Sequence, residues 1–436
     1  MVIDAGAIAS VHALACAWVL AGAFDHVSDD DFARVTIAQV FAHAPRLDPS
    51  ATSWLPFPFW LLGTAMAIFG RSLHVARVAS IAFASLAATL PYLALQIGPA
   101  RASRARALAA VAFAMISPWS LWLGASTVPE SFTASFTAAS AIALGGFAAE
   151  PSACKLQPWF ALPLFAACLS RYESWPVAAV LAIVLGARQW RRRRAETIVA
   201  IALLVLGPLA WMVWNAHAHG SFFHFFHRVS NYKRAIGEGS TDALTALLFY
   251  PRLLIATRPD VVGGAACAML SLRRAEVRRV WSVPLACATT SMIFLACGNV
   301  RDGAPAHHPE RALLGIVFVL AMFTVDALGR VLPELMKGAR VTWMVVPLTL
   351  LVGWIVNLRA LWGDNVPGTS SHEDRRTQLA TGRKLRAEHV EHMIVTPCAF
   401  EHFALIASFG EPERVHVQPR SSDPNETDCP RIERIE

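Results

Sequence analysis

Apolar stretches long enough to cross a membrane recur from residue 5 to residue 358, and they constrain the fold more than any other feature. A hydrocarbon core about 30 Å thick is spanned by about 20 helical residues, and only helices and closed barrels satisfy their backbone groups there. The stretches lack the period-2 alternation of barrel strands. Because 55% of the 436 residues are hydrophobic and only 16% are charged, a soluble domain could not bury this apolar surface. The sequence therefore predicts an all-α polytopic membrane protein.

We expect about eleven transmembrane helices, at residues 5–24, 75–98, 107–125, 128–148, 158–170, 174–188, 196–215, 255–272, 280–298, 312–331 and 341–358. The stretches at 158–170 and 174–188 are short, which is typical of a hairpin that reaches only part of the way across. The first stretch ends in small residues that resemble a signal cleavage site. No Lys or Arg precedes it, so we interpret it as an uncleaved anchor.

The apolar segment 54–70 is expected to be a re-entrant or juxtamembrane helix in the first external loop. Pro56 and Pro58 break its first turn, and Trp54 and Trp60 suit the headgroup boundary. Counting this segment as a full crossing would invert the sidedness of every later connection.

Basic residues gather in the connections on one side of this threading: Arg101, Arg104, Arg106, Arg191 to Arg194, Arg273, Arg274, Arg278, Arg279, Arg330, Lys337 and Arg340. That side is cytoplasmic by the positive-inside bias. The net charge of +7 therefore reflects membrane orientation, and we expect no nucleic-acid partner. The prediction is a multi-pass integral membrane protein, in the plasma (inner) membrane if the source is bacterial, with any active site facing outside the cytoplasm.

The composition becomes polar after residue 360. We expect residues 1–360 to form a transmembrane catalytic domain and residues 361–436 to form a small extracytoplasmic soluble domain or tail. Cys398 and Cys429 lie in this second region, where an oxidising compartment allows a disulfide without requiring one.

Three successive carboxylates, Asp29, Asp30 and Asp31, follow the first apolar stretch. Like charges at such short range raise at least one pKa, which suits a general base near neutral pH. The alternative is a solvated N-terminal cap for the amphipathic stretch 32–41, and composition alone weighs the two equally.

A second cluster contains His307, His308, Glu310 and Arg311, immediately before an apolar helix. A guanidinium and imidazoles at a helix N-terminus make a suitable cradle for a phosphate or diphosphate. An interfacial loop whose arginine reaches the lipid headgroups is the alternative. Metal ligation by the two histidines is less convincing, because adjacent side chains rarely point the same way.

Three further charged residues are candidates for substrate contact. Glu130 opens a membrane helix near its outer end, where a carboxylate is a functional candidate, although helix capping also explains it. Arg171 and Glu173 lie in the turn of the short hairpin, and we favour pairing between them. A loop rich in His and Phe, residues 217–227, suits either a lipid-linked phosphate or interfacial anchoring.

The order of these motifs resembles the GT-C superfamily of integral-membrane glycosyltransferases, which take a sugar from a polyprenyl-phosphate or dolichyl-phosphate carrier. The elements that carry the resemblance are Asp30-Asp31-Phe32, Trp54-Leu55-Pro56-Phe57-Pro58 with Gly70 and Arg77, Ser117-Pro118, Val128-Pro129-Glu130, Ser170-Arg171-Tyr172-Glu173 and His308-Pro309-Glu310-Arg311. The last element is similar to the His-x-Glu-x-Arg element of dolichyl-phosphate-mannose-dependent mannosyltransferases, although Glu310 and Arg311 are adjacent here.

The resemblance implies inverting transfer of mannose or another hexose or pentose from a polyprenyl-phosphate-linked donor to a lipid, glycan or protein acceptor. The carboxylate pair would then deprotonate or orient the acceptor hydroxyl, with Asp30 favoured as the base, Asp31 second and Asp29 in an outer position. Arg311, with His307 or His308, would stabilise the leaving phosphate, and Glu130 would orient the acceptor.

The sequence leaves two other classes of protein open. A lipid or glycan flippase or secondary transporter would place substrate residues at the membrane midplane and would often show inverted repeats, which the halves of this chain do not. A noncatalytic scaffold would tolerate Asp30→Ala. The sequence identifies no cofactor, and a divalent metal stays an open alternative.

Overall fold

The computed structural model describes residues 1–22, 24–98, 100–149, 156–191, 194–235, 242–305, 308–335, 345–362, 366–370, 373–397, 399–418 and 431–435. Its α-helices are α1 Val2–Ala21, α2 Asp30–His43, α3 Phe57–Phe69, α4 Leu73–Ala87, α5 Thr89–Ile97, α6 Arg104–Met115, α7 Pro118–Ala125, α8 Glu130–Ala149, α9 Gln157–Cys168, α10 Trp175–Gln189, α11 Arg194–His219, α12 His224–Ala235, α13 Ala243–Thr257, α14 Pro259–Met269, α15 Ala275–Val300, α16 Leu314–Leu335, α17 Val345–Leu358, α18 Arg376–Ala387 and α19 His402–Phe409. The short 3-10 helices are η2 Tyr172–Ser174, η3 Leu270–Arg273, η4 Pro309–Leu313, η6 Arg359–Leu361 and η7 Pro412–Arg414, and the strands are β1 His392–Thr396, β2 Val415–Val417 and β3 Arg431–Ile435.

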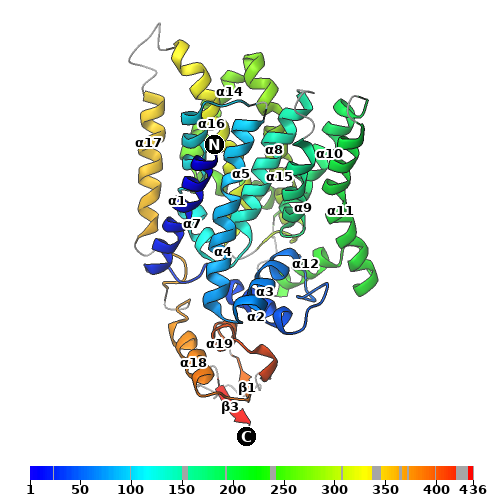
Figure 1. Cartoon of the computed structure of the whole chain (residues 1–436), viewed down its shortest axis with the longest axis vertical. Coiled ribbons are helices and arrows are strands. Elements are labelled where there is room, and N and C mark those ends of the chain that lie inside the picture. Colours follow the sequence, from blue (N-terminus) through cyan, green and yellow to red (C-terminus); the bar gives the residue numbers. More distant parts are fainter. Residues whose placement is uncertain are drawn as a thin grey trace.

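Most of these helices run roughly along the long axis of the molecule and form one bundle (Figure 1). By length and composition, six helices of the described part can cross a membrane, or up to eight if each of two bent pairs forms one span. The chain is therefore a multi-pass integral membrane protein. The expected eleven crossings are not confirmed, because several of the expected stretches form shorter helices. Helices α9 and α10 have only 12 and 15 residues, in keeping with the short hairpin suggested by the sequence.

Two of the expected crossings are not straight. Helices α6 and α7 meet at 75°, and α13 and α14 meet at 99°. A proline begins the second helix of each pair, Pro118 in α7 and Pro259 in α14. Proline disfavours helical geometry in the preceding residue, so an apolar stretch that reads as continuous is divided at these positions. The stretch at 255–272, expected as a single straight span, therefore contains a bend near its start and is not confirmed as one crossing.

Helix α8 lies at the centre of the bundle and is completely buried over its apolar span. Its sequence is rich in Ala, Ser, Thr and Gly, which allow neighbouring helices to approach closely. A Cβ on Gly145 would lie only 3.0 Å from the Val283 side chain of α15, and Ser140 donates a hydrogen bond to the Phe160 carbonyl of α9 at 2.7 Å. This central packing fixes the start of α8, where Glu130 lies.

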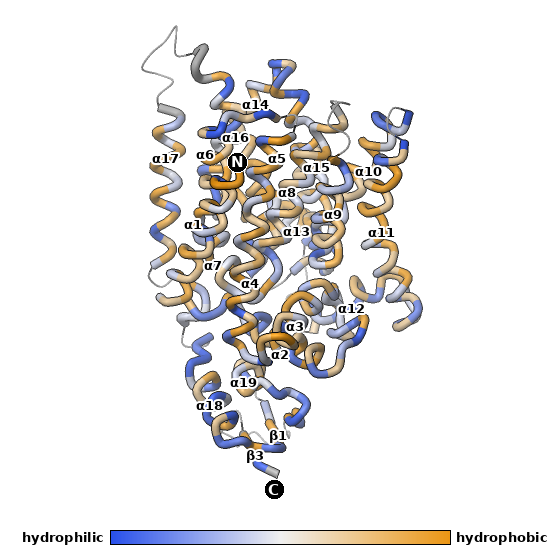
Figure 2. Tube along the Cα trace, in the orientation of Figure 1, coloured by the Kyte–Doolittle hydropathy of each residue, from blue (hydrophilic) through white to orange (hydrophobic). Residues whose placement is uncertain are grey.

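The two ends of the bundle carry different chemistry. The connections between α5 and α6, α10 and α11, and α14 and α15 lie at the upper end of Figure 1, whereas α2, α3, α12 and the C-terminal segment lie at the other end. Figure 2 shows apolar residues along the body between them. At the upper end Arg330 donates to the Ala100 carbonyl, and Arg106 lies 3.6 Å from Asp326. The basic connections are thus remote from the triple aspartate.

The C-terminal segment, which was expected to be a small soluble domain or tail, contains a small α/β unit with a three-stranded sheet. Strand β1 is central, with β2 parallel on one side and β3 antiparallel on the other, so that Ile394 pairs with both His416 and Glu433. Alternating burial along His392–Thr396 explains the strand, since Met393 and Val395 face the core with side chains of α18 and α19. Cys398 and Cys429 lie outside the described residues, so the disulfide stays a prediction.

Helix α2 joins this unit to the bundle. It packs against α3 on one side and against α19 on the other, and Phe32, Val35 and Ala38 share an apolar cluster with the C-terminal residues Leu379 and Ala407. Helix α3 is the apolar helix expected at 54–70, and its 13 residues are too few for a full crossing.

Candidate functional site

Asp31 organises the backbone at the start of α2. Its carboxylate accepts hydrogen bonds from the backbone N–H groups of Val27 at 3.0 Å, Ser28 at 3.3 Å and Thr127 at 2.9 Å. The side chain is only 4% exposed, and burial raises its pKa even though these N–H groups favour the charged form. The sequence suggested a raised pKa in this triplet, but its main cause here is burial rather than repulsion among the carboxylates.

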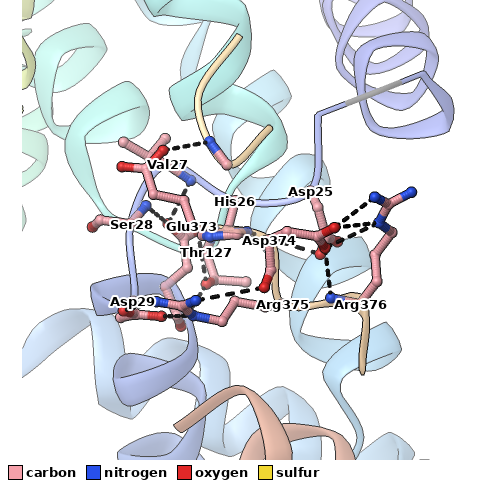
Figure 3. A network of polar contacts seen from close by, with 12 residues as sticks. Asp25, His26, Val27, Ser28, Asp29, Thr127, Glu373, Asp374, Arg375 and Arg376 are labelled. Carbon is pink, nitrogen blue, oxygen red and sulfur yellow. Dashed lines mark hydrogen bonds and ion pairs between the residues drawn. The ribbon is translucent and has the colours of Figure 1, made fainter. Parts of the chain in front are cut away.

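The other two carboxylates of the triplet bind two different arginines. Asp29 accepts two hydrogen bonds from Arg375, at 2.7 Å from Nε and 2.8 Å from Nη2 (Figure 3). Asp30 accepts one from Nη2 of Arg311 at 2.7 Å. Asp30 of the triplet and Arg311 are therefore in contact, although they lie 281 residues apart in the sequence. Asp29 is the N-cap residue of α2, but its side chain makes no capping hydrogen bond, so the capping interpretation does not describe it.

Next to Asp30, arginine and glutamate side chains alternate in a chain of ion pairs. Arg311 Nε is 3.8 Å from Glu130, and Arg171 Nη1 is 2.9 Å from the same carboxylate, which is 3% exposed. Arg171 also pairs with Glu173 at 2.6 Å, as expected for this turn. Burial lowers the pKa of Arg171, but Glu173 and Glu130 outweigh it and raise the pKa above its usual range. The two carboxylates therefore keep Arg171 charged.

Arg34 is a functional candidate that the sequence did not single out. It lies one turn after Asp30 on α2, is 3% exposed, and its guanidinium lies 4.4 Å from the ring centroid of Trp54. Among the residues that the structure describes, its Nε and Nη1 atoms have no hydrogen-bond partner although both are buried. Burial lowers its pKa to about 10, against the opposing effect of Glu130 and Asp30, so the side chain is charged at neutral pH. Such a cation can bind an anion strongly.

Several of these groups border a cavity of about 1400 Å³. Asp29, Asp30, Arg34, Arg171, Glu173, His308 and Arg311 line its polar part. Leu244, Leu247, Phe294 and Leu295 of α13 and α15, together with Phe223 and Phe226 near α12, line an apolar part. A molecule with a charged head and a hydrocarbon tail fits both linings.

The His- and Phe-rich loop forms part of this wall. Phe225 stacks on Tyr172 with ring centroids 4.4 Å apart, and the Tyr172 hydroxyl donates to the Ser53 carbonyl at 2.7 Å and accepts from Trp211 at 3.0 Å. These contacts connect α12 with the Arg171–Glu173 turn. At least part of the loop is therefore structural.

The second histidine cluster is only partly at the cavity. His308 lines it, adopts left-handed backbone with φ 47°, and lies 3.7 Å from Glu373. Glu310 does not line the cavity, and neither do Glu130 and Asp31. His307 lies outside the described residues, so its expected role stays a prediction.

Three residues that line the cavity were not predicted from the sequence: Arg34, Arg375 and Glu373. An arginine four residues after Asp30 on an amphipathic helix was a readable signal for Arg34, since such residues share a helix face. No comparable signal existed for Arg375, because its proximity to Asp29 arises from tertiary folding. Among the described residues, no group of three His, Cys, Asp or Glu side chains could hold a metal ion.

No family model matches the sequence. Over 212 residues the chain is 26% identical to the undecaprenyl phosphate-alpha-4-amino-4-deoxy-L-arabinose arabinosyl transferase of Pseudomonas aeruginosa, a match covering 46% of this chain and 37% of that protein. The protein from Pseudomonas paraeruginosa with the same name matches to the same extent. The matched region thus spans little more than a third of these relatives.

Solved structures give longer matches. The crystal structure of ArnT from Cupriavidus metallidurans bound to undecaprenyl phosphate superposes with a TM-score of 0.56 and 14% identity, covering 94% of this chain and 75% of that one. The Archaeoglobus fulgidus oligosaccharyltransferase in complex with Zn and sulfate gives a TM-score of 0.52 and 12% identity, covering 94% and 62%. The resemblance suggested by the sequence motifs is therefore confirmed at the level of architecture, and the chain has the GT-C fold.

Proposed function

We propose that this protein is an inverting glycosyltransferase that moves a sugar from a polyprenyl-phosphate carrier to an acceptor hydroxyl. The observation that carries the proposal is the contact between Asp30 and Arg311 at a cavity with one charged and one apolar lining. A carboxylate beside a guanidinium provides both a proton acceptor and a stabiliser for a leaving phosphate. The GT-C fold and the partial match to undecaprenyl-phosphate-dependent relatives support the same chemistry.

In the proposed reaction the acceptor oxygen attacks the anomeric carbon of the sugar. The bond between that carbon and the phosphate oxygen breaks, and its electron pair leaves with the carrier phosphate. Asp30 takes the proton of the acceptor hydroxyl. Arg311 and Arg34 stabilise the negative charge that develops on the phosphate oxygen. Attack and departure on opposite faces of the sugar invert the anomeric configuration.

The charges around the site support an exchange of partners when the donor binds. Arg34, Arg171 and Arg311 are balanced by three carboxylates, Asp30, Glu130 and Glu173. Asp30 is 31% exposed and Arg311 is 6% exposed, so the carboxylate is the more accessible member of their pair. A carrier phosphate would take the Arg311 contact and release Asp30 toward the acceptor. Buried Glu130 would hold both Arg171 and Arg311 in place rather than contact the acceptor.

The apolar lining supports a polyprenyl donor, because Leu244, Leu247 and Phe294 provide contact area for isoprenoid units next to the charged site. The donor sugar is proposed only as a hexose or pentose. The relatives named above are arabinosyl transferases by name, and 4-amino-4-deoxy-L-arabinose is a pentose. The similarity of the His308–Arg311 element to that of mannosyltransferases instead favoured mannose. The acceptor is proposed as a lipid, glycan or protein hydroxyl.

The proposed site faces outside the cytoplasm. The basic connections at the opposite end of the bundle support this orientation by the positive-inside bias (Figure 1). In a bacterial host the membrane would be the plasma (inner) membrane.

The test is transfer of label by the purified chain from undecaprenyl-phosphate-linked mannose, glucose and 4-amino-4-deoxy-L-arabinose to a membrane lipid extract. We expect turnover with one of these donors, release of undecaprenyl phosphate, and loss of both in Asp30→Asn. Arg311→Ala should lose more activity than Arg311→Lys, since lysine keeps the positive charge. The matched control is Glu411→Gln, which changes an exposed pair with Arg414 in the C-terminal unit. Full turnover by Asp30→Asn would refute the proposal.

A further inference from the structure

The connection between the bundle and the C-terminal unit runs along the start of α2. Its described residues are 366–370 and 373–375, which we name the connector. Gly368, at φ 78°, donates its N–H to the Glu373 carboxylate at 3.2 Å, and a Cβ there would lie 2.9 Å from the His26 carbonyl oxygen. Only glycine fits this close approach without strain. The connector is therefore packed directly against the turn from His26 to Asp29, which precedes α2 (Figure 3).

Arg375 ends the connector and makes two hydrogen bonds with Asp29 of the neighbouring segment. Its planar guanidinium meets both carboxylate oxygens of Asp29, and the two side chains are 12% and 20% exposed. Paired hydrogen bonds of this kind are stronger and more directional than a single one. Glu373 and Glu401 are further negative charges near Arg375, and both help raise its pKa after the larger effect of Asp29.

The C-terminal unit also holds α2 farther along the helix. Gln39 donates its side-chain N–H to the Ala407 carbonyl of α19 at 2.8 Å. A separate ion pair, Arg71 with Glu413 at 2.7 Å, ties the unit to the connection between α3 and α4, away from the cavity. Loss of the Arg375 contact alone would therefore leave the unit attached by other interactions.

We propose that Arg375 is a positioning residue that separates the carboxylates of the triplet, holding Asp29 away from Arg311 so that Asp30 is the member of the triplet that pairs with Arg311. The inference rests on the proposed function and adds a role for the C-terminal unit in building the site. Without Arg375, the charge of Asp29 is uncompensated beside two other carboxylates and competes for Arg311. It also repels an incoming phosphate.

Charge separation and simple tethering predict different results for the two members of the pair. Removing Asp29 leaves Arg375 with Glu373 and Glu401 nearby, and the site gains no negative charge. Removing Arg375 leaves an extra negative charge next to the site. If the pair only tethered the connector to the start of α2, removing Asp29 and removing Arg375 would impair the protein equally, because each change breaks the same hydrogen bonds.

The experiment compares Asp29→Asn, Arg375→Gln and the double variant for binding of undecaprenyl phosphate and for kcat and KM with the donor used by the unmodified chain. We expect Arg375→Gln to bind undecaprenyl phosphate about 5- to 10-fold more weakly, the effect of one unit charge at about 8 Å in a partly hydrated site. We expect kcat to fall by about 10- to 100-fold as Asp30 is displaced. Asp29→Asn should stay within about 3-fold of the unmodified chain, and adding it to Arg375→Gln should restore most of the loss.

The matched control is Arg71→Gln, which removes an ion pair of the same unit and should leave binding and turnover unchanged. The inference is overturned if Asp29→Asn is impaired as much as Arg375→Gln, or if the double variant is no better than Arg375→Gln at an equal Tm. Full turnover by Asp30→Asn would instead refute the proposed function. The binding series for Asp29 and Arg375 needs no turnover, so it separates the two failures.

Discussion

Replacing Asp30 by Asn should abolish sugar transfer and at the same time tighten the binding of undecaprenyl phosphate. In the resting structure the Asp30 carboxylate is 2.7 Å from Nη2 of Arg311, so it occupies the cation that the phosphate needs. Asparagine keeps the size of the side chain and one acceptor oxygen, but it removes the competing charge. General damage to the site would lower both activity and affinity. It would not abolish transfer and at the same time raise the affinity for undecaprenyl phosphate.

The magnitude follows from the geometry of this pair. A phosphate on the same guanidinium would lie about 5 Å from the Asp30 carboxylate, where two unit charges repel by roughly 0.8–3 kcal/mol for effective dielectric constants of about 80 to 20. Asp30 is 31% exposed, so water weakens this repulsion. We therefore expect about 1–2 kcal/mol, which corresponds to about 5- to 30-fold tighter binding.

The assay is the Kd of undecaprenyl phosphate for the purified protein in detergent, measured by tryptophan fluorescence at fixed pH and at two salt concentrations. Glu411→Gln is the control for an unrelated loss of negative charge. Equal or weaker binding by Asp30→Asn, in a variant with an unchanged Tm, would show that the phosphate does not compete with Asp30 for Arg311. The gain should shrink at higher salt because the site is partly open to solvent.

Three other predictions concern binding and stability. Arg34→Ala should weaken undecaprenyl phosphate binding by about 10-fold or more, the loss of one charge-assisted contact, and Arg34→Lys should lose less; equal affinities in all three proteins would exclude Arg34 from the phosphate site. Burial lowers the pKa of His402, so below about pH 6.5 the unfolded chain gains a proton before the folded chain does, and stability should fall as the pH drops through this window. Tm measured from pH 7.5 to 5.5 should decline less in His402→Gln, and parallel curves would contradict the assignment. Gly382→Ala places a Cβ 2.0 Å from Ser408 Oγ and should cost about 1–3 kcal/mol of unfolding free energy, whereas Gly263→Ala, which meets no atom within 4 Å, should not destabilise the protein in the same denaturation experiment.

Much of the fold could be predicted because the bilayer permits few solutions. The length of the apolar stretches correctly predicted a helix in each stretch that was expected to cross the membrane. The basic residues predicted which connections share one end of the bundle (Figure 1). Composition did not reveal the bend before Pro259 or the sheet around β1. A single proline or a short alternating segment changes local geometry without changing mean hydropathy.

For the candidate site, the residues alone show which side chains are unusual for a membrane protein, namely the carboxylates after the first apolar stretch and Arg311 immediately before the stretch at 312–331. The division of the triplet depends on tertiary folding, which pairs Asp29 with Arg375, Asp30 with Arg311 and Asp31 with backbone N–H groups. Adjacent residues in a turn point in different directions, and the partner of each depends on which remote segment packs there. Sequence proximity therefore identified the cluster, while packing assigned each carboxylate its partner.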